Sequence, residues 1–352
     1  MEEQDRSNIL SNLPEKTRNL ISNSVAALLI LMLVMLLIVS YRTIAARYSG
    51  YSETEVLMNA SFDIRANGRN SGANVKDAFE RIRELDALLN YYDEKSEITS
   101  INNMAGISAV AVNKDTYEII DRAYKFSART GGAYDLTIGP LVDMWRPYFR
   151  DKNSIPAGNG LVYAQHLVNY GNIQLNSQNE TVKLMYAGMK LYLDGISRGY
   201  AISKARTLLV EKGVKSAVIS CGDCMTVIGD NNGKPWKIGI KHPRRMDEQV
   251  GNVVLSAGQA MSTTGDYENY FEMNGKRYHD VLDPATGMPA GETESATVIC
   301  DDAADAEMLS HAVFVMGPKK GMAFISSFKD TFAVIVDKDG NVTTSPGLTL
   351  ER

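Results

Sequence analysis

The chain has 352 residues, of which 44% are hydrophobic and 22% are charged, as in a folded globular protein and unlike a disordered or wholly membrane-embedded one. A formal net charge of -5, with no basic face that carries interleaved aromatic residues, argues against nucleic acid as a partner. This length suffices for one large domain, or two ordinary ones, behind a terminal extension.

An apolar run near the N-terminus predicts one membrane-spanning helix. The residues from Val25 to Val39 are all apolar, and their neighbours extend the run over 20–41, about the 20 residues that a spanning helix requires. A cleaved signal peptide is the alternative, but the run is long for one, and Arg42 and Arg47 follow it at once. We therefore expect an uncleaved anchor.

Charged residues on the two sides of this run predict its orientation. Arg6, Lys16 and Arg18 precede it and slightly outnumber the arginines after it, which favours an N-terminus in the cytoplasm. The protein is then a single-pass protein of the inner (cytoplasmic) membrane, with its main domain on the extracytoplasmic, periplasmic side. The expected parts are a cytoplasmic tail over 1–19, a transmembrane anchor over 20–41, a linker over 42–55 and a domain over 56–352.

The remainder of the chain predicts a mixture of helices and strands. Apolar residues at helical spacing predict helices over 75–89, 114–129, 197–212, 303–315 and 319–327. Short apolar runs predict strands over 216–219, 226–228, 236–240 and 332–336. Because the two types alternate without a sustained parallel rhythm, we expect a single large α+β (mixed α/β) domain.

Two cysteines form a C-x-x-C motif at Cys221 and Cys224. One such pair supplies too few ligands for a structural zinc site. The pair is compatible with a disulfide, with a redox couple, or with small buried residues on a strand and turn.

Several loops are richer in Gly, Asp, Thr and Pro than simple connections require. The segment from Gly131 to Pro140 places glycines, Tyr134 and Asp135 in one turn, which would let the backbone approach a ligand while the tyrosine covers a ring. The segment from Asp194 to Ala201 opens a helix, so its free N–H groups and Arg198 are suited to phosphate. Taken alone, the first segment is better explained as a helix stop followed by a tight turn, and the second is equally compatible with an N-capping turn that carries a surface arginine.

Polar loops and one helix toward the C-terminus add further candidates. Hydroxyl and carboxylate side chains crowd the segments 263–267 and 278–287, and ligand contacts concentrate on such loops. Glu307 and His311 are four residues apart on a predicted helix with Ser310 beside them, so both project from one face and can ligate a metal. A solvated helix face is the commoner role for such a pair.

Taken in order, these segments resemble the FAD:protein FMN transferases of the ApbE family, over most of the chain from Met58 to about Val336. The most specific piece is G-G-A-[FY]-D-x-T-x-G-P-L-V, here Gly131 to Val142. The remaining landmarks are Met58 ahead of a strand, Tyr92 before Ser96-Glu97-Ile98, G-I-S-R-G-Y-A from Gly195, G-D-Y from Gly265, D-P-A-T-G from Asp283 and the helix with Glu307 and His311.

The resemblance implies an enzyme that binds FAD with Mg²⁺, or with Mn²⁺ or another divalent ion. It would transfer FMN through a phosphoester bond to a Thr or Ser of an acceptor protein and release AMP. The acceptor would be a flavoprotein subunit of an extracytoplasmic electron-transfer system. A flavin-binding protein without transfer activity and a metal-dependent FAD pyrophosphatase are the alternatives.

The resemblance also implies roles for single residues. The FAD-binding residues would be Met58, Tyr92, Ala133, Tyr134, Asp135, Asp194, Arg198 and Val281. The metal-binding residues would be Gly195, through its carbonyl, with Glu307, Ser310 and His311.

This sequence departs from the family pattern at the metal-binding positions and at the position of the catalytic base. Glu307 stands where the family has a metal-binding Asp, and His311 where it has Thr, although imidazole suits Mg²⁺ less well than oxygen. The family's His before the D-P-x-T-G strand falls on Asp280, with His279 one residue earlier. Either residue is therefore a candidate for the catalytic base.

Overall fold

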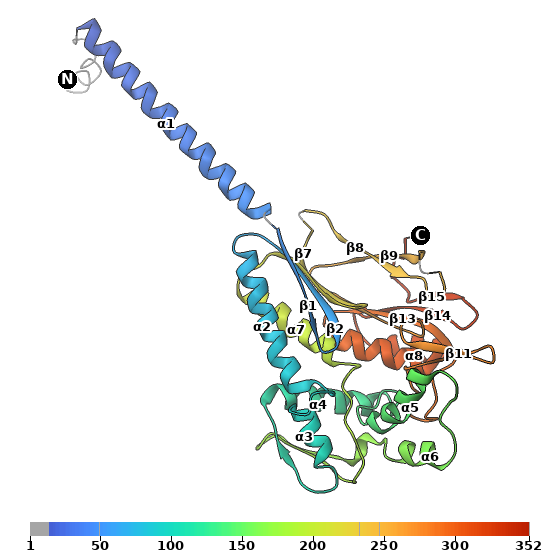
Figure 1. Ribbon diagram of the computed structural model, residues 1–352. Coiled ribbons are helices and arrows are strands. Elements are labelled where there is room, and N and C mark those ends of the chain that lie inside the picture. Colours follow the sequence, from blue (N-terminus) through green and yellow to red (C-terminus); the bar gives the residue numbers. More distant parts are fainter. Residues whose placement is uncertain (1–13, 49, 232, 246, 352) are drawn as a thin grey trace. The chain divides into compact units, whose positions relative to one another are not determined.

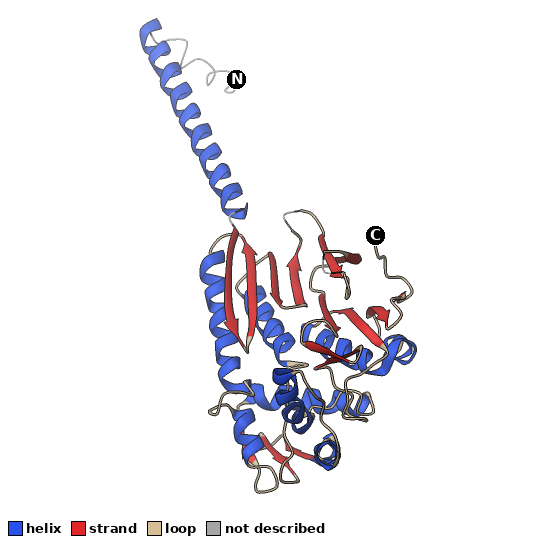
Figure 2. Cartoon of the chain, turned by 45° about the vertical axis from the view of Figure 1, so that its right-hand side comes forward, coloured by secondary structure: helices blue, strands red, loops and turns tan. Residues whose placement is uncertain are grey.

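The computed structural model describes residues 14–351 except 49, 232 and 246, and for 42–48 it describes the backbone alone. The chain divides into two units, Met1–Ser49 and Gly50–Arg352. The first unit contains helix α1 (Glu15–Tyr48) and the second contains the folded domain, shown in Figures 1 and 2.

Helix α1 contains the apolar run predicted over 20–41. Within its segment Glu15–Tyr41, the most apolar window of 18 residues has a mean hydropathy of 2.7 and no buried residue, so the helix is long and apolar enough to cross a membrane. The helix begins before the predicted span and ends after it. Most of the tail predicted over 1–19 lies outside the described residues.

The prediction of a linker over 42–55 is wrong. Helix α1 continues to Tyr48, and strand β1 (Gly50–Leu57) pairs along its whole length with strand β2 (Ala60–Asn67). Exposed and half-buried residues alternate along β1, as expected for a strand at the edge of the sheet with one face toward solvent. The domain therefore begins at Gly50, six residues before the predicted boundary.

Within the described residues, eight strands form one antiparallel sheet in the order β1-β2-β6-β7-β10-β13-β14-β15. The strands beyond the first two are β6 (Ser216–Cys221), β7 (Cys224–Gly229), β10 (Ala260–Gly265), β13 (Thr293–Cys300), β14 (Phe332–Asp337) and β15 (Val342–Thr344). The strands predicted over 216–219, 226–228 and 332–336 are confirmed as parts of β6, β7 and β14.

Three helices cover one face of this sheet (Figure 1). They are α2 (Ser71–Leu89), α7 (Ser197–Glu211) and α8 (Ala303–Ile325). The helices predicted over 75–89 and 197–212 are confirmed with boundaries shifted by a few residues. Helix α8 joins the two helices predicted after 303, and Gly317, at φ 78 and ψ 168, breaks its regular geometry between them.

The other face of the sheet is covered by the hairpin of β8 (Trp236–Lys241) and β9 (Gln249–Leu255). Strand β13 is buried along its whole length because it lies between these two layers. Its Ala296 and Val298 pack into the core under the helices, whereas Ile299 packs against the hairpin side. The predicted α+β domain is thereby confirmed.

Smaller elements surround one end of the sheet. The helices are α3 (Glu97–Asn103), α4 (Lys114–Arg129), α5 (Gly139–Asp151), α6 (Asn159–His166) and the short η1 (Tyr170–Asn172). The strands are β3 (Val110–Ala111), β4 (Ile173–Asn176), β5 (Thr181–Leu184), β11 (Tyr270–Met273) and β12 (Lys276–His279). Helix α4 has the bounds that its apolar periodicity predicts.

Helices α7 and α8 approach each other closely at Gly199. A Cβ built on Gly199 would lie 2.3 Å from the carbonyl oxygen of Ala303 and 2.8 Å from Cα of Ala304. Glycine is therefore required for the first turn of α7 to contact the first turn of α8. This contact brings Arg198, the residue before it, next to α8.

We expect Gly199→Ala to lower the free energy of unfolding by about 1–3 kcal/mol or more, because the added methyl group overpacks two backbones. Gly291→Ala is the matched control, since no atom lies within 4 Å of its Cβ position. Chemical denaturation of both full-length variants in detergent measures the difference. Equal stability of the two variants would contradict the close-contact interpretation.

Candidate active site

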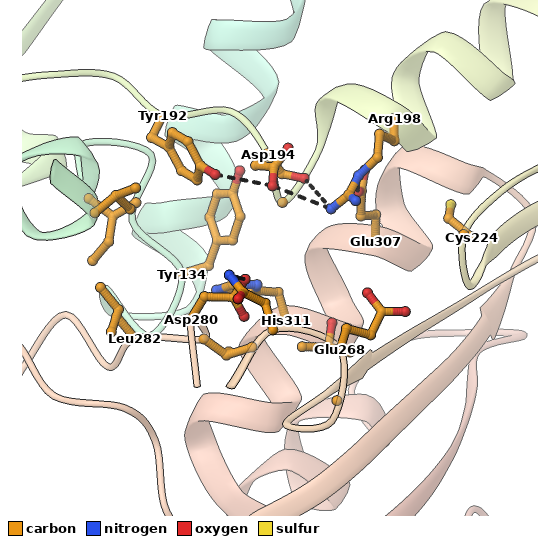
Figure 3. A pocket seen from close by; sticks show the side chains of 18 of the residues that line it. Tyr134, Tyr192, Asp194, Arg198, Cys224, Glu268, Asp280, Leu282, Glu307 and His311 are labelled. Atoms are coloured by element: carbon orange, nitrogen blue, oxygen red, sulfur yellow. Dashed lines mark hydrogen bonds and ion pairs between the residues drawn. The ribbon is translucent and has the colours of Figure 1, made fainter. Parts of the chain in front are cut away.

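A cavity of about 280 Å³ lies among side chains from distant parts of the sequence (Figure 3). Its walls come from α5, the first turn of α7, the turn between β6 and β7, strand β10 with the loop that follows it, the segment after β12, and α8. The loops that the sequence singled out at 131–140, 194–201, 263–267 and 278–287 all contribute to it.

An ion pair between α7 and α8 lines this cavity. Nε of Arg198 lies 3.2 Å from Oε1 of Glu307, and the backbone N–H of Gly199 donates to Oε2 at 2.8 Å. Nη2 of Arg198 also lies 3.5 Å from Oδ2 of Asp194 (Figure 3). The guanidinium therefore lies between two carboxylates and borders the cavity.

Burial and pairing set the protonation of this ion pair. Burial raises the pKa of the Glu307 carboxyl to about 7, while Arg198 and the Gly199 N–H act in the opposite direction. The carboxylate of Asp194, followed by that of Glu307, holds the pKa of Arg198 well above its usual value. Arg198 is consequently a permanent cation, suited to an anionic ligand.

Two aromatic rings pack beside the backbone of Gly195. The rings of Tyr134 and His311 are nearly perpendicular, with centroids 5.9 Å apart. A Cβ on Gly195 would lie 3.1 Å from the Tyr134 ring and 3.6 Å from Nδ1 of His311, so glycine keeps the backbone close to both. Burial lowers the pKa of His311 to about 4, which leaves a neutral imidazole at pH 7.

The two candidate bases face different environments. Asp280 borders the cavity, where its Oδ2 accepts a hydrogen bond of 3.0 Å from the side chain of Asn269. Solvent reaches this carboxylate through the cavity, but the surrounding protein still raises its pKa to about 6. His279 points away from the cavity, and its Nε2 lies 2.7 Å from the carbonyl oxygen of Ala290. The geometry thus favours Asp280.

The turn between β6 and β7 brings the C-x-x-C motif to the cavity. Cys221 and Cys224 are paired residues on either side of the turn, and both are free, buried thiols. Burial raises the pKa of Cys221 to about 12 and raises that of Cys224 as well, so both stay protonated at pH 7. Asp223 within the turn pairs with Lys241 at 2.6 Å and accepts from the Tyr267 hydroxyl at 3.0 Å.

One part of the cavity wall is rich in aromatic residues. Tyr92, Trp145, Phe149 and Tyr192 line it together with Arg146. Sequence reasoning missed the three residues from α5, although Trp145 and Phe149 are four apart in the helix and so share a face. It also missed Glu268 and Asn269, which follow β10.

Comparison with known proteins identifies the family. The sequence model of the ApbE family matches residues 58–336. The chain belongs to the ApbE family. The FAD:protein FMN transferase of Treponema pallidum is 28% identical over 322 residues, which cover 86% of this chain and 89% of that protein. The FAD:protein FMN transferase of Klebsiella pneumoniae (strain 342) is 31% identical over 298 residues, covering 84% and 92%.

Solved structures of ApbE proteins share the fold. The crystal structure of the ApbE protein from Thermotoga maritima is 31% identical, with a TM-score of 0.78, and covers 85% of this chain and 97% of that chain. The apo flavinyl transferase ApbE from Pseudomonas stutzeri is 25% identical, with a TM-score of 0.73, and covers 85% and 95%.

Most residues that the ApbE resemblance implied border the cavity. They are Tyr92, Tyr134, Asp135, Asp194, Gly195, Arg198, Asp280, Val281, Glu307 and His311. The Asp135 carboxylate is also engaged within the protein, since it accepts hydrogen bonds from the backbone and hydroxyl of Thr137 and from the backbone of Tyr170. Asp135 therefore holds its own turn in place beside Tyr134.

Four of the implied residues, including His279, lie outside the cavity lining. Met58 is buried in the main core at the turn between β1 and β2, and Ala133 lies in the turn that precedes Tyr134. The hydroxyl of Ser310 points toward the sheet, where it lies 2.9 Å from the Thr264 hydroxyl and donates to the carbonyl of Glu307.

The Mg²⁺ site that the ApbE resemblance implied does not fit the residues present. Both carboxylate oxygens of Glu307 are engaged, Ser310 points elsewhere, and His311 offers nitrogen where Mg²⁺ prefers oxygen. Among the described residues, no three His, Cys, Asp or Glu side chains gather as a metal site. The imidazole of His311 is a donor that suits a borderline ion such as Zn²⁺ better than it suits Mg²⁺.

We expect Glu307→Ala to lower the free energy of unfolding by about 3–5 kcal/mol, because it leaves the Arg198 cation and the Gly199 N–H without their buried partner. Glu292→Ala is the matched control, since its exposed pair with Lys338 contributes about 1 kcal/mol or less. Thermal and denaturant unfolding of the two full-length variants in detergent compares them. If Glu307→Ala lowers the free energy of unfolding as little as Glu292→Ala does, the Arg198–Glu307 pair does not stabilise the fold.

Proposed function

We propose that this protein is a FAD:protein FMN transferase. It would transfer FMN from FAD to a Thr or Ser of an acceptor protein through a phosphoester bond and release AMP. The observation that supports this most directly is the cavity itself, in which Arg198 is available for a diphosphate and an aromatic wall for a ring. The similar proteins of Treponema pallidum and Klebsiella pneumoniae are named for this activity.

The charge around the cavity constrains how a diphosphate binds there. Among the described residues, the carboxylates that line it are Asp135, Asp194, Asp223, Glu268, Asp280 and Glu307. Arg198 and Arg146 are the opposing cations in the same lining. Because carboxylates outnumber cations, an anionic diphosphate requires added positive charge, which supports the proposal that a divalent cation accompanies the substrate.

Asp280 is the proposed base for the acceptor hydroxyl. Its carboxylate borders the cavity, and the side chain of Asn269 donates a hydrogen bond to one of its oxygens. Phosphoryl-type transfer depends mainly on positioning and charge neutralisation, so the base has only to take the hydroxyl proton as the new bond forms. Arg198 would stabilise charge on the diphosphate in the same step.

The apolar helix α1 supports a proposed location. It would anchor the protein as a single pass in the inner membrane, with the domain on the extracytoplasmic side. The proposed acceptor is then a flavoprotein subunit of an extracytoplasmic electron-transfer system. Protease protection of the domain in sealed spheroplasts would contradict this orientation.

Intact mass measurement tests the transferase proposal. The full-length protein in detergent is incubated with FAD, a divalent cation and an acceptor domain that carries a Ser or Thr target. We expect the acceptor to gain the mass of one FMN phosphoester and AMP to appear in equal amount. Bound but unchanged FAD would instead identify a flavin-binding protein, and free FMN with AMP would identify a pyrophosphatase.

The pH dependence of transfer tests the role of Asp280. Since desolvation by the surrounding protein raises its pKa to about 6, the carboxyl is protonated and inactive below that pH, so transfer should rise between about pH 5 and 7 and then level off. Asp280→Asn should reduce the rate by about a hundredfold or more and remove this rise. The exposed Asp301→Asn is the control. An unchanged profile in Asp280→Asn would exclude Asp280 as the base.

The preference of the protein for Mn²⁺ or Mg²⁺ tests whether Glu307 and His311 change the metal that the site accepts. We expect Mn²⁺ to support transfer by the native protein better than Mg²⁺ does, because His311 supplies nitrogen. The double variant Glu307→Asp with His311→Thr restores the family's oxygen donors and should reverse this preference. Calorimetry with FAD present measures the affinity for each ion. The order of these affinities tests the preference independently of the rate of transfer. Identical preferences in both proteins would contradict the prediction.

A further inference from the structure

A second arginine borders the cavity at its aromatic wall. Arg146 lies on α5, and its guanidinium is 4.8 Å from the ring centroid of Tyr92 and 5.6 Å from that of Tyr91. Both distances are within the range of a cation–π contact. Arg146 therefore adds a cation to a wall that consists otherwise of rings.

The charge of Arg146 is incompletely neutralised by its neighbours. Its Nη2 lies 2.8 Å from Oδ1 of Asp143, but the other oxygen of that carboxylate is paired with the ammonium of Lys190. One carboxylate thus serves two cations. A net positive charge remains next to the aromatic wall.

The hydrogen-bonding capacity of Arg146 is also incompletely used. Its Nε and Nη2 are closed to solvent, and neither makes a hydrogen bond within the described part of the chain. The side chain as a whole is 41% exposed, so the part of the guanidinium that a ligand can reach is Nη1. A role limited to packing against Tyr92 leaves the donors of Nη1 to solvent.

We propose that Arg146 binds the isoalloxazine ring of the flavin substrate, with Nη1 of its guanidinium donating to a ring carbonyl oxygen. This inference rests on the proposed function. Isoalloxazine carries two carbonyl oxygens and three fused rings, whereas adenine has no carbonyl group and a smaller face. Tyr92 and Phe149 supply apolar contact surface for the larger ring, and the fully buried Trp145 packs behind Phe149.

A cation at a ring carbonyl has an electronic consequence. It stabilises negative charge on the isoalloxazine, so it should raise the reduction potential of bound FAD and shift its visible absorption band. Simple packing of Arg146 against Tyr92 would produce neither effect. These two readouts therefore separate a ligand contact from a purely structural role.

The test compares Arg146→Met, Arg146→Lys and the control Arg150→Met in the full-length protein in detergent. Arg150 lies one turn further along α5 and is exposed. Binding of FAD, riboflavin and AMP is measured by calorimetry, and the bound flavin by absorption and redox titration. We expect Arg146→Met to weaken FAD and riboflavin binding about tenfold, to leave AMP binding unchanged and to lower the flavin potential. Arg146→Lys should restore part of both effects.

Three outcomes decide the inference. Unchanged flavin affinity and potential in Arg146→Met would overturn it, while FMN transfer by the native protein would leave the proposed function standing. Loss of AMP binding in place of riboflavin binding would place adenine at this wall and would also overturn it. If the native protein binds no flavin, the proposed function and this inference fail together.

Discussion

The charged part of the cavity depends on the contact between the first turns of α7 and α8. Gly199 lets the two backbones meet, and its N–H and the Arg198 guanidinium share the carboxylate of Glu307. A buried ion pair contributes little net stability, yet the loss of either partner is costly. This pair therefore acts mainly to hold a permanent cation at the cavity, and every proposal about phosphate binding depends on it.

The cavity combines two surfaces that suit different parts of a dinucleotide. Arg198 lies among carboxylates, whereas Tyr92, Trp145 and Phe149 belong to an aromatic wall with Arg146. A ligand that contains both a diphosphate and a large ring can use both surfaces at once. On the proposed function, the excess of carboxylates would make binding of such a ligand depend on added positive charge, which a cation bound together with the substrate would supply.

Where this chain departs from the ApbE pattern, the side chains at the implied metal and base positions differ in chemistry but keep their places in the fold. Glu307 and His311 occupy consecutive turns of α8, as the family's Asp and Thr would, but the longer carboxylate reaches Arg198 and the imidazole is neutral. Asp280 replaces a histidine with a carboxylate whose pKa lies near 6, the range in which a histidine titrates. If Asp280 is the base, as proposed, desolvation by the surrounding protein would let a carboxylate act in the pH range of a histidine.

The sequence was sufficient to predict those elements whose pattern of apolar or motif residues is local. Apolar periodicity predicted α4 with its observed bounds, the apolar run predicted α1, and ordered motifs predicted most of the cavity lining. The polar edge strand β1 was mistaken for a linker because its pairing with β2, and not its composition, makes it a strand. Tertiary structure alone decided that Asp280 and not His279 borders the cavity, since neighbouring residues at the end of β12 face opposite sides. It alone brought Arg146 to the aromatic wall, because contacts between residues far apart in sequence leave no local periodicity to detect.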